Sequence, residues 1–155
     1  MKFALSGGLL LGTYDGATVE IVDHAGQDNV FLFGFTTNEV NERRKIHNFG
    51  QPEYPAELIE AIDFIRSGKL GDPSVYDPLV RTIFEEKDFY LISDDFCSYL
   101  AAQKMVDEAY VDQDRWTQMS IETTAKMGFF SSDRAVMQYA EEIWNIEPIE
   151  IPAKH

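Results

Sequence analysis

The chain opens with the pattern that most constrains its fold: a short apolar run, a glycine-containing turn and then an amphipathic helical repeat. Residues 9–13 form a nearly continuous apolar run, as expected of a strand buried on both faces of a parallel sheet. Asp15 and Gly16 follow and can start a helix. Gly26 is placed to end that helix in the left-handed conformation that glycine adopts at low cost. This order predicts one strand-helix unit of an α/β fold.

The same alternation continues along the chain. Residues 29–34 and 89–93 are the other two strand candidates. A helix is predicted from the reciprocal capping pair Thr36 and Glu39, closing at Gly50. Further helices are predicted over residues 56–67, from Asp77 and Pro78, from a cap at Ser93, after a break at Asp112, and from Ser131 or Ser132. With no internal repeat or linker, the sequence predicts a single domain over residues 1–155, with about three parallel strands covered by helices.

Apolar and aromatic side chains in the second half of the chain predict a large core. The last helix carries an apolar stripe at helical spacing. Six aromatic residues are interpreted as core rather than as a platform for sugar stacking: Phe89, Tyr90, Phe96, Tyr99, Trp116 and Trp144. The stripe consists of Val136, Met137, Ala140, Ile143 and Trp144.

Charge and cysteine content narrow the classes of function. The 155 residues include 27 acidic and 13 basic side chains, and the net charge is −14. A nucleic-acid or anionic-membrane surface is therefore disfavoured. Cys97 is the single cysteine, so an internal disulfide is excluded and a reducing, cytoplasmic location is predicted. No apolar stretch reaches the roughly 20 residues of a spanning helix. The first residues superficially resemble a secretory signal peptide, but Gly7 and Gly8 interrupt the apolar run, which argues against secretion.

Few residues suggest chemistry by their pattern alone. Lys2 is ordinarily a solvated end residue. The turns at residues 6–8 and 12–16 could bind an anion, but they fit neither the dinucleotide fingerprint nor the phosphate-binding loop, so tight turns are the favoured interpretation. The three histidines lie far apart in unsuitable spacing, so no metal site is predicted, and a nucleophile triad is equally unsupported. Arg134 is expected to form an exposed ion pair after a helix cap rather than to bind an anion.

Several motifs, in order, nevertheless resemble the α-glucan phosphorylases, the glycogen, starch and maltodextrin phosphorylases. The family's lysine bound to pyridoxal phosphate lies in a Met-Lys-Phe segment followed by an apolar run and a glycine turn. The matching segments are Met1-Lys2-Phe3, Gly12-Thr13-Tyr14-Asp15-Gly16-Ala17, His24-Ala25-Gly26-Gln27-Asp28-Asn29-Val30-Phe31-Leu32-Phe33-Gly34, Gly128-Phe129-Phe130-Ser131-Ser132-Asp133-Arg134 and Gln138-Tyr139-Ala140-Glu141-Glu142-Ile143-Trp144.

The resemblance implies that Lys2 is the lysine that anchors pyridoxal phosphate, that little else of the active site lies in this chain, and that none of its residues is catalytic. It implies a helix-rich, C-terminal part of a Rossmann-like domain of the GT-B type. The full-length relatives are hexosyltransferases that release glucose 1-phosphate from α-1,4-glucans in glycogen and starch breakdown. The family's phosphate-binding glycine loop, glucose-binding carboxylate and substrate-binding basic residues lie upstream of the lysine, so we expect the isolated chain to be inactive. Phe129 replaces a lysine usual in the family.

Three interpretations remain open at this stage. The chain can be the C-terminal piece of a phosphorylase, whose partner is the missing upstream segment. It can be a noncatalytic assembly or regulatory module that pairs with a second polypeptide, or with itself, through an open sheet edge. It can also be a truncated gene product, since Met1 fits both a true start and an internal residue. Glucan preference and regulation leave no trace in the sequence.

Overall fold

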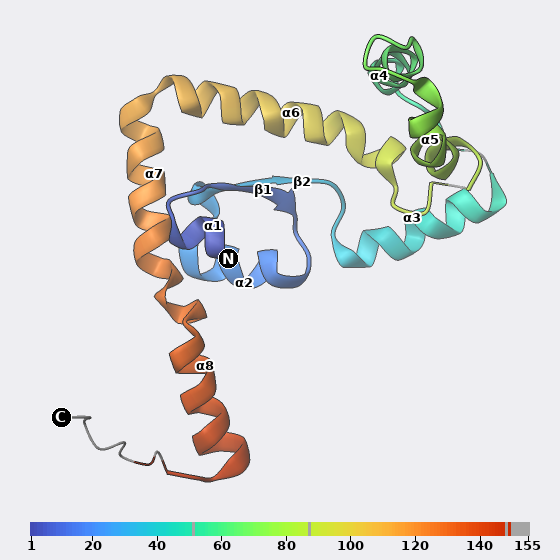
Figure 1. Ribbon diagram of the computed structural model, residues 1–155. Helices are drawn as coiled ribbons and strands as arrows, with labels where there is room; N and C mark the ends of the chain where they lie inside the picture. The colour runs from blue at the N-terminus through green and yellow to red at the C-terminus, as the bar shows by residue number, and fades with distance from the viewer. Residues whose placement is uncertain (51, 87, 148, 150–155) are drawn as a thin grey trace.

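The structure is a computed structural model, and it describes residues 1–50, 52–86, 88–147 and 149 (Figure 1). Its frame consists of two helices, α6 (Ile92–Val111) and α7 (Gln113–Lys126), which meet at Asp112 and form a corner. The N-terminal part of the chain lies inside this corner. A group of three helices packs at the far end of α6, and the last helical segment leads away from the end of α7.

A β-α-β unit occupies the corner between α6 and α7. Strands β1 (Leu10–Thr13) and β2 (Val30–Phe33) are parallel, with Leu10 opposite Val30 and Thr13 opposite Phe33. Helix α2 (Gly16–Ala25) and a 3₁₀ turn, η1 (Gln27–Asn29), connect them. This confirms the first two predicted strands and the helix between them. Gly26 ends α2 with a positive φ of 90°, although its ψ of 145° lies outside the left-handed helical region.

The third predicted strand, over residues 89–93, is wrong. Residues 88–90 form a turn, and α6 begins at Ile92. The reason is Asp88, which is completely buried and whose carboxylate accepts hydrogen bonds from the N–H groups of Ile92, at 2.9 Å, and Ser93, at 2.7 Å. Because this side chain satisfies the first free N–H groups of a helix, the segment turns and coils instead of extending. Ser93, predicted as the cap, instead donates its hydroxyl to Asp88.

The remaining helices follow the sequence signals closely. The carboxylate of Glu39 accepts from the N–H of Thr36 at 2.8 Å, as the capping pattern predicts. Asp112 caps α7 by accepting from Arg115 N–H at 3.1 Å, and Ser131 caps the last α-helix. These elements are α3 (Thr37–Phe49), α4 (Ala56–Arg66), η2 (Pro73–Tyr76), α5 (Asp77–Phe84), η3 (Met127–Phe130), α8 (Ser132–Gln138) and a π-helical turn, η4 (Tyr139–Trp144).

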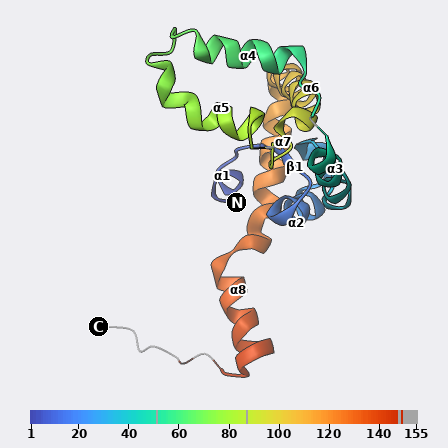
Figure 2. The same ribbon diagram turned by 90° about the vertical axis from the view of Figure 1, so that its right-hand side faces the viewer.

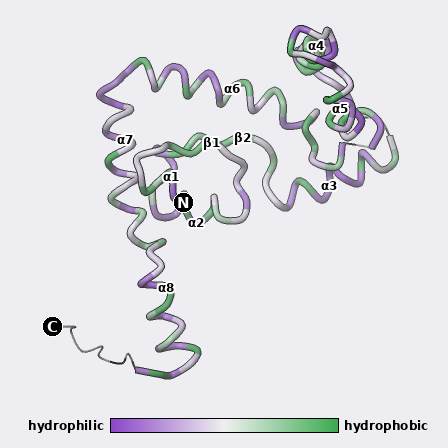
Figure 3. The backbone as a smooth tube through the Cα atoms, viewed as in Figure 1, coloured by the Kyte–Doolittle hydropathy of each residue, from purple (hydrophilic) through white to green (hydrophobic). Residues whose placement is uncertain are grey.

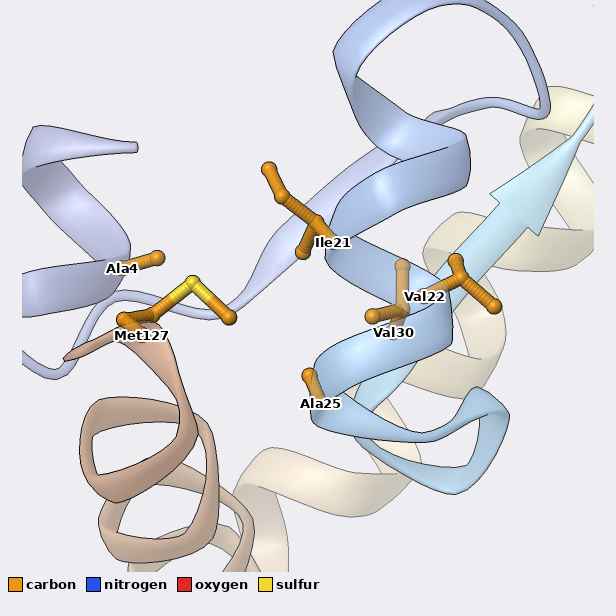
Figure 4. Close-up of a cluster of buried hydrophobic side chains, with 6 residues drawn as sticks. All are labelled: Ala4, Ile21, Val22, Ala25, Val30 and Met127. Carbon is orange, nitrogen blue, oxygen red and sulfur yellow. The ribbon is translucent and has the colours of Figure 1, made fainter. Parts of the chain in front are cut away.

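Three hydrophobic clusters hold these elements together. The first joins the start of the chain to η3 through six buried side chains: Ala4, Ile21, Val22, Ala25, Val30 and Met127 (Figure 4). The second joins α4 and α5, which run side by side, to the start of α6 (Figure 2). The third packs Phe31 of β2 on Ala109 of α6 and Met119 of α7. The first half of β2 is therefore buried against helices that lie far from it in the sequence, whereas β1, expected to be buried on both faces, is only partly buried.

The predicted core of the second half is only partly correct. Phe89, Tyr90 and Trp144 are 58%, 68% and 58% exposed, so these three aromatic residues are not core. Of the predicted stripe on the last helix, only Ala140 is buried. Segment α8–η4 stands away from the other elements (Figures 1 and 2), although its tube carries hydrophobic residues (Figure 3).

None of the helices in the described ranges combines the length and the apolar character that crossing a bilayer requires. The longest, α6, has 20 residues and carries several acidic side chains.

Candidate functional site

The predicted site residue, Lys2, is the first residue of α1 (Lys2–Leu5), a helix of only four residues. The side chain of Lys2 is exposed, and that of the next residue, Phe3, is 88% exposed. Ala4 is the one buried residue of α1, at 5% exposure. The helix therefore rests on a single small side chain and presents the Lys2 amine to solvent, where it is accessible to a ligand.

Two hydroxyl groups of α7 hold the segment that follows Lys2. Ser120 Oγ donates to the carbonyl oxygen of Gly7 at 2.8 Å, and Thr124 Oγ1 donates to that of Ala4 at 3.3 Å. Ala4 also packs against Met127, which is completely buried (Figure 4). The position of α1 is thus fixed by residues from a distant part of the sequence.

The glycine pair after α1 makes a tight turn into β1. Gly7 has a φ of 86°, and a Cβ atom there would lie 2.8 Å from Ser120 Oγ. The N–H groups of Gly7 and Gly8 donate to the carbonyl oxygens of Ala4, at 3.2 Å, and Phe3, at 2.8 Å. Because both amides are already engaged, this turn offers neither of them to a phosphate group. The interpretation as a structural turn is supported.

The carboxyl end of the sheet is acidic. Gly34, after β2, approaches the carboxylate of Asp95 so closely that a Cβ atom would lie 2.9 Å from its Oδ1. Burial raises the pKa of Asp95 above its ordinary value, and the negative charges of Asp94, Asp88 and Asp15 raise it further, against the hydrogen bond from Phe35 N–H. These carboxylates would repel a phosphate group at this end of the strands.

Aromatic packing covers the segment of residues 128–134, which joins η3 to α8. The His24 ring stacks on Phe129 with centroids 3.8 Å apart, and the Arg134 guanidinium carbon lies 3.9 Å from the Phe129 centroid. Two groups this close to one ring must occupy opposite faces, so neither face is free for a sugar. Arg134 also donates to the Phe129 carbonyl and to Gln138. Among the residues that the structure describes, Arg134 packs and bonds there and forms no ion pair, contrary to the prediction.

The asparagine of the second motif has a structural role. Asn29 is 6% exposed, and its amide donates to the carbonyl oxygen of Ala25 at 2.8 Å and to Glu122 Oε2 at 3.0 Å. The pKa of Glu122 lies below its ordinary value because Asn29 and then Gln118 donate to its carboxylate. Asn29 therefore joins the end of α2 to α7 across the start of β2.

Two further features of the described residues were not predicted from the sequence. One is a groove of about 570 Å³ between the start of β2 and the α6–α7 corner, with Met105, Arg115 and Met119 among its lining residues. The other is a buried pair in which His47 Nε2 lies 3.2 Å from Asp94 Oδ2. Both unite residues that are distant in sequence, so no local pattern could have predicted them.

The residues present fit one end of pyridoxal phosphate. The exposed amine of Lys2 is a nucleophile able to bond with the cofactor's aldehyde. The phosphate end finds no cradle in the glycine turn at residues 6–8 or at the acidic strand ends described above. Groups from elsewhere would be needed to hold the phosphate.

Comparison with known proteins places these features in context. The family model described as Carbohydrate phosphorylase matches residues 1–146. Glycogen phosphorylase of Saccharomyces cerevisiae is 43% identical over 152 residues, 96% of this chain and 17% of that protein. The α-glucan phosphorylase H isozyme of Solanum tuberosum is 47% identical over 157 residues, 98% and 19% of the two chains. For the cytosolic α-glucan phosphorylase 2 of Arabidopsis thaliana the identity is 46%, and the shares are 98% and 18%. The chain thus spans about a fifth of the length of these relatives.

Proposed function

Because this chain belongs to the carbohydrate phosphorylase family, we propose that it is the C-terminal part of a pyridoxal-phosphate-dependent α-1,4-glucan phosphorylase. The complete enzyme would use phosphate to release glucose 1-phosphate from the nonreducing end of glycogen or starch. The observation that carries this proposal is the match over residues 1–146, which includes the segment containing Lys2. We further propose one domain over residues 1–155, the distal part of a Rossmann-like domain of the GT-B type, with a cytoplasmic location.

In this proposal Lys2 is the anchor of the cofactor, and it takes no part in the chemistry of the substrate. When bound, the cofactor supplies the phosphate group that exchanges protons with the substrate phosphate. In this chain α1 carries the amine, and the turn at Gly7 directs the chain into β1. No other side chain of the chain is assigned to the reaction.

We propose that the isolated chain is inactive. Positioning and electrostatic stabilisation supply most of the rate enhancement in transfers of this kind. The amides of the glycine turn at residues 6–8 are engaged, and the carboxylates of Asp15, after β1, and of Asp95, on α6, lie near the carboxyl end of the sheet. A lysine without a phosphate cradle would hold the cofactor weakly.

A second candidate function, a noncatalytic assembly or regulatory module, is favoured by the edge of β1. In the described part of the chain, β1 pairs with β2 and with no other strand, so its second edge is open. An open edge presents unpaired N–H and C=O groups to another polypeptide. The partner would be the missing phosphorylase segment, a second copy of this chain or a separate protein.

Two measurements test these proposals. The purified chain, incubated with pyridoxal phosphate and then with borohydride, should carry the reduced cofactor at Lys2 when its peptides are weighed, and Lys2→Arg should abolish that product. Equal modification of all exposed lysines would contradict selective attachment at Lys2 in this chain. Incubation with glucan and phosphate should release no glucose 1-phosphate, and turnover by the isolated chain would overturn the claim that it is inactive. A defined polypeptide that copurifies and restores or modulates turnover would favour the second candidate.

A further inference from the structure

Hydrogen bonds as well as packing attach α1 and the turn after it to α7. An isolated helix of four residues is unstable in water, so residues 2–5 need tertiary contacts to remain helical. The contacts come from consecutive turns of one helix face, since Ser120, Thr124 and Met127 are spaced by four and three residues. Ser120 lies at the Gly7 carbonyl, Thr124 at the Ala4 carbonyl, and Met127 beneath the Ala4 side chain.

The contact between the Gly7 turn and α7 leaves no room for a side chain at residue 7. A Cβ atom on Gly7 would lie only 2.8 Å from Ser120 Oγ, so the Ser120 hydroxyl can occupy this position beside the Gly7 carbonyl because residue 7 has no side chain. Thr124 Oγ1 is shared between the Ala4 carbonyl and the carbonyl of Ser120 in its own helix, at 2.9 Å. The hydroxyl therefore links the two segments at a fixed separation.

We infer that Ser120 and Thr124 are positioning residues for the cofactor lysine: by holding the carbonyl groups of Gly7 and Ala4, they fix where the amine of Lys2 stands. This inference rests on the proposed function. Lys2 lies only two residues before Ala4 in the same helix, so a shift of α1 moves the amine with it. Displacements of about 1 Å are enough to lower the reactivity of a positioned group strongly.

The test is site-resolved labelling of the full 155-residue chain. Pyridoxal phosphate is added so that the lysine nitrogen bonds to the aldehyde carbon and one water leaves. Borohydride then delivers hydride to that carbon, a proton from water completes the amine, and mass spectrometry gives the yield at Lys2 relative to exposed Lys69. In Ser120→Ala/Thr124→Val, the loss of two hydrogen bonds should lower this ratio about fivefold.

Two variants act as controls. Ser120→Thr/Thr124→Ser keeps both hydroxyl groups and should recover most of the wild-type ratio. Thr117→Val makes the same type of change at an exposed position of α7 and should leave the ratio unchanged. An unchanged ratio in Ser120→Ala/Thr124→Val, in a protein with wild-type circular dichroism, would overturn the inference.

Hydrogen exchange separates failure of this inference from failure of the proposed function. If wild-type Lys2 is labelled no more than Lys69, selective attachment at Lys2 fails in this chain. The amides of Gly7 and Gly8, which are bonded within the α1 turn, still report whether the hydroxyl groups hold α1. Faster exchange of these amides in the double variant supports the positioning role, and unchanged exchange overturns it whatever the labelling shows. If the double variant does not fold, Thr124→Val alone is measured in the same way.

Discussion

The N-terminal unit, which runs from α1 to β2 over residues 2–33, and segment α8–η4 have similar amphipathic sequences but opposite surroundings. Ile21, Val22 and Val30 are all less than 10% exposed, because α7 and η3 cover them. Val136 and Ile143, on the last helical segment, are 56% and 66% exposed. Helical periodicity determines which side of a helix is apolar. It does not determine whether the chain contains a surface to cover that side, and this explains why one predicted core exists and the other does not.

The largest expected effect tests this contrast directly. Met127 is completely buried in the cluster of Figure 4, so Met127→Ala should lower the free energy of unfolding by about 3 kcal/mol through the lost burial and the cavity. Met137, on α8, is 40% exposed, and Met137→Ala is the matched control, with an expected change within about 0.5 kcal/mol. Urea unfolding of both variants measures the difference. Equal losses would show that α8 is as well packed as the N-terminal unit.

The next effect concerns α6, which forms one wall of the corner around the sheet. Asp88→Ala removes a buried carboxylate that accepts from Ile92 N–H, Ser93 N–H and Ser93 Oγ–H. The free energy of unfolding should fall by about 2 kcal/mol, since helix N–H groups lose their partner in a buried place. Asp72→Ala, at an exposed cap of η2, is the control and should cost less. A smaller loss for Asp88→Ala than for Asp72→Ala would contradict the role assigned to Asp88.

The case of Asp88 also shows how far the sequence could predict this fold. The local signals for β1, β2 and the capped helices were sufficient, because each depends on residues within a few positions of one another. The error at residues 89–93 arose because a run of four apolar residues followed by serine suits a strand or a helix start equally well. The deciding partner is the buried Asp88 carboxylate, whose bonds only the structure shows.

The candidate site likewise combines a residue that the sequence indicated with contacts that only the structure shows. The resemblance to the family located Lys2, and the structure adds that its side chain is exposed. The contacts of α1 with Ser120 and Thr124 could not be predicted, because they join segments far apart in the sequence and no local repeat signals them. The same holds for Phe129, whose two faces are covered by His24 and Arg134.

A moderate effect is expected from Gly7→Ala, which tests how closely the N-terminal unit approaches α7. Alanine at a φ of 86° is strained, and its Cβ atom would lie 2.8 Å from Ser120 Oγ. The free energy of unfolding should fall by about 1 to 2 kcal/mol. Gly71→Ala is the control, because Gly71 also has a positive φ but has no heavy atom within 4 Å of the added Cβ. If both variants lose the same amount, backbone strain alone explains the effect and the contact with Ser120 contributes nothing measurable.

The smallest expected effect is a pH dependence at Asp95, which lies in the first turn of α6 with its carboxylate at Gly34, after β2. Its pKa is raised chiefly by burial, so the charged form is less favourable in the folded than in the unfolded chain. The resulting stability is present below the ordinary pKa of an aspartate and is lost as the pH rises through the higher pKa of the folded state. The substitution Asp95→Asn leaves a side chain that is neutral at every pH and keeps an oxygen that can accept from Phe35 N–H. This variant should therefore gain stability relative to the wild type as the pH rises from about 3 to about 7.

Urea unfolding at several pH values measures this gain, and Asp107→Asn, an exposed position on α6, is the matched control. Neighbouring Asp94, Asp88 and Asp15 add repulsion of the same sign, so the gain should shrink in salt if these charges contribute and persist in salt if burial dominates. Because burial is the larger cause, we expect most of the gain to persist. A gain equal to that of Asp107→Asn at every pH would show that the carboxyl end of the sheet is as well solvated as the outer face of α6.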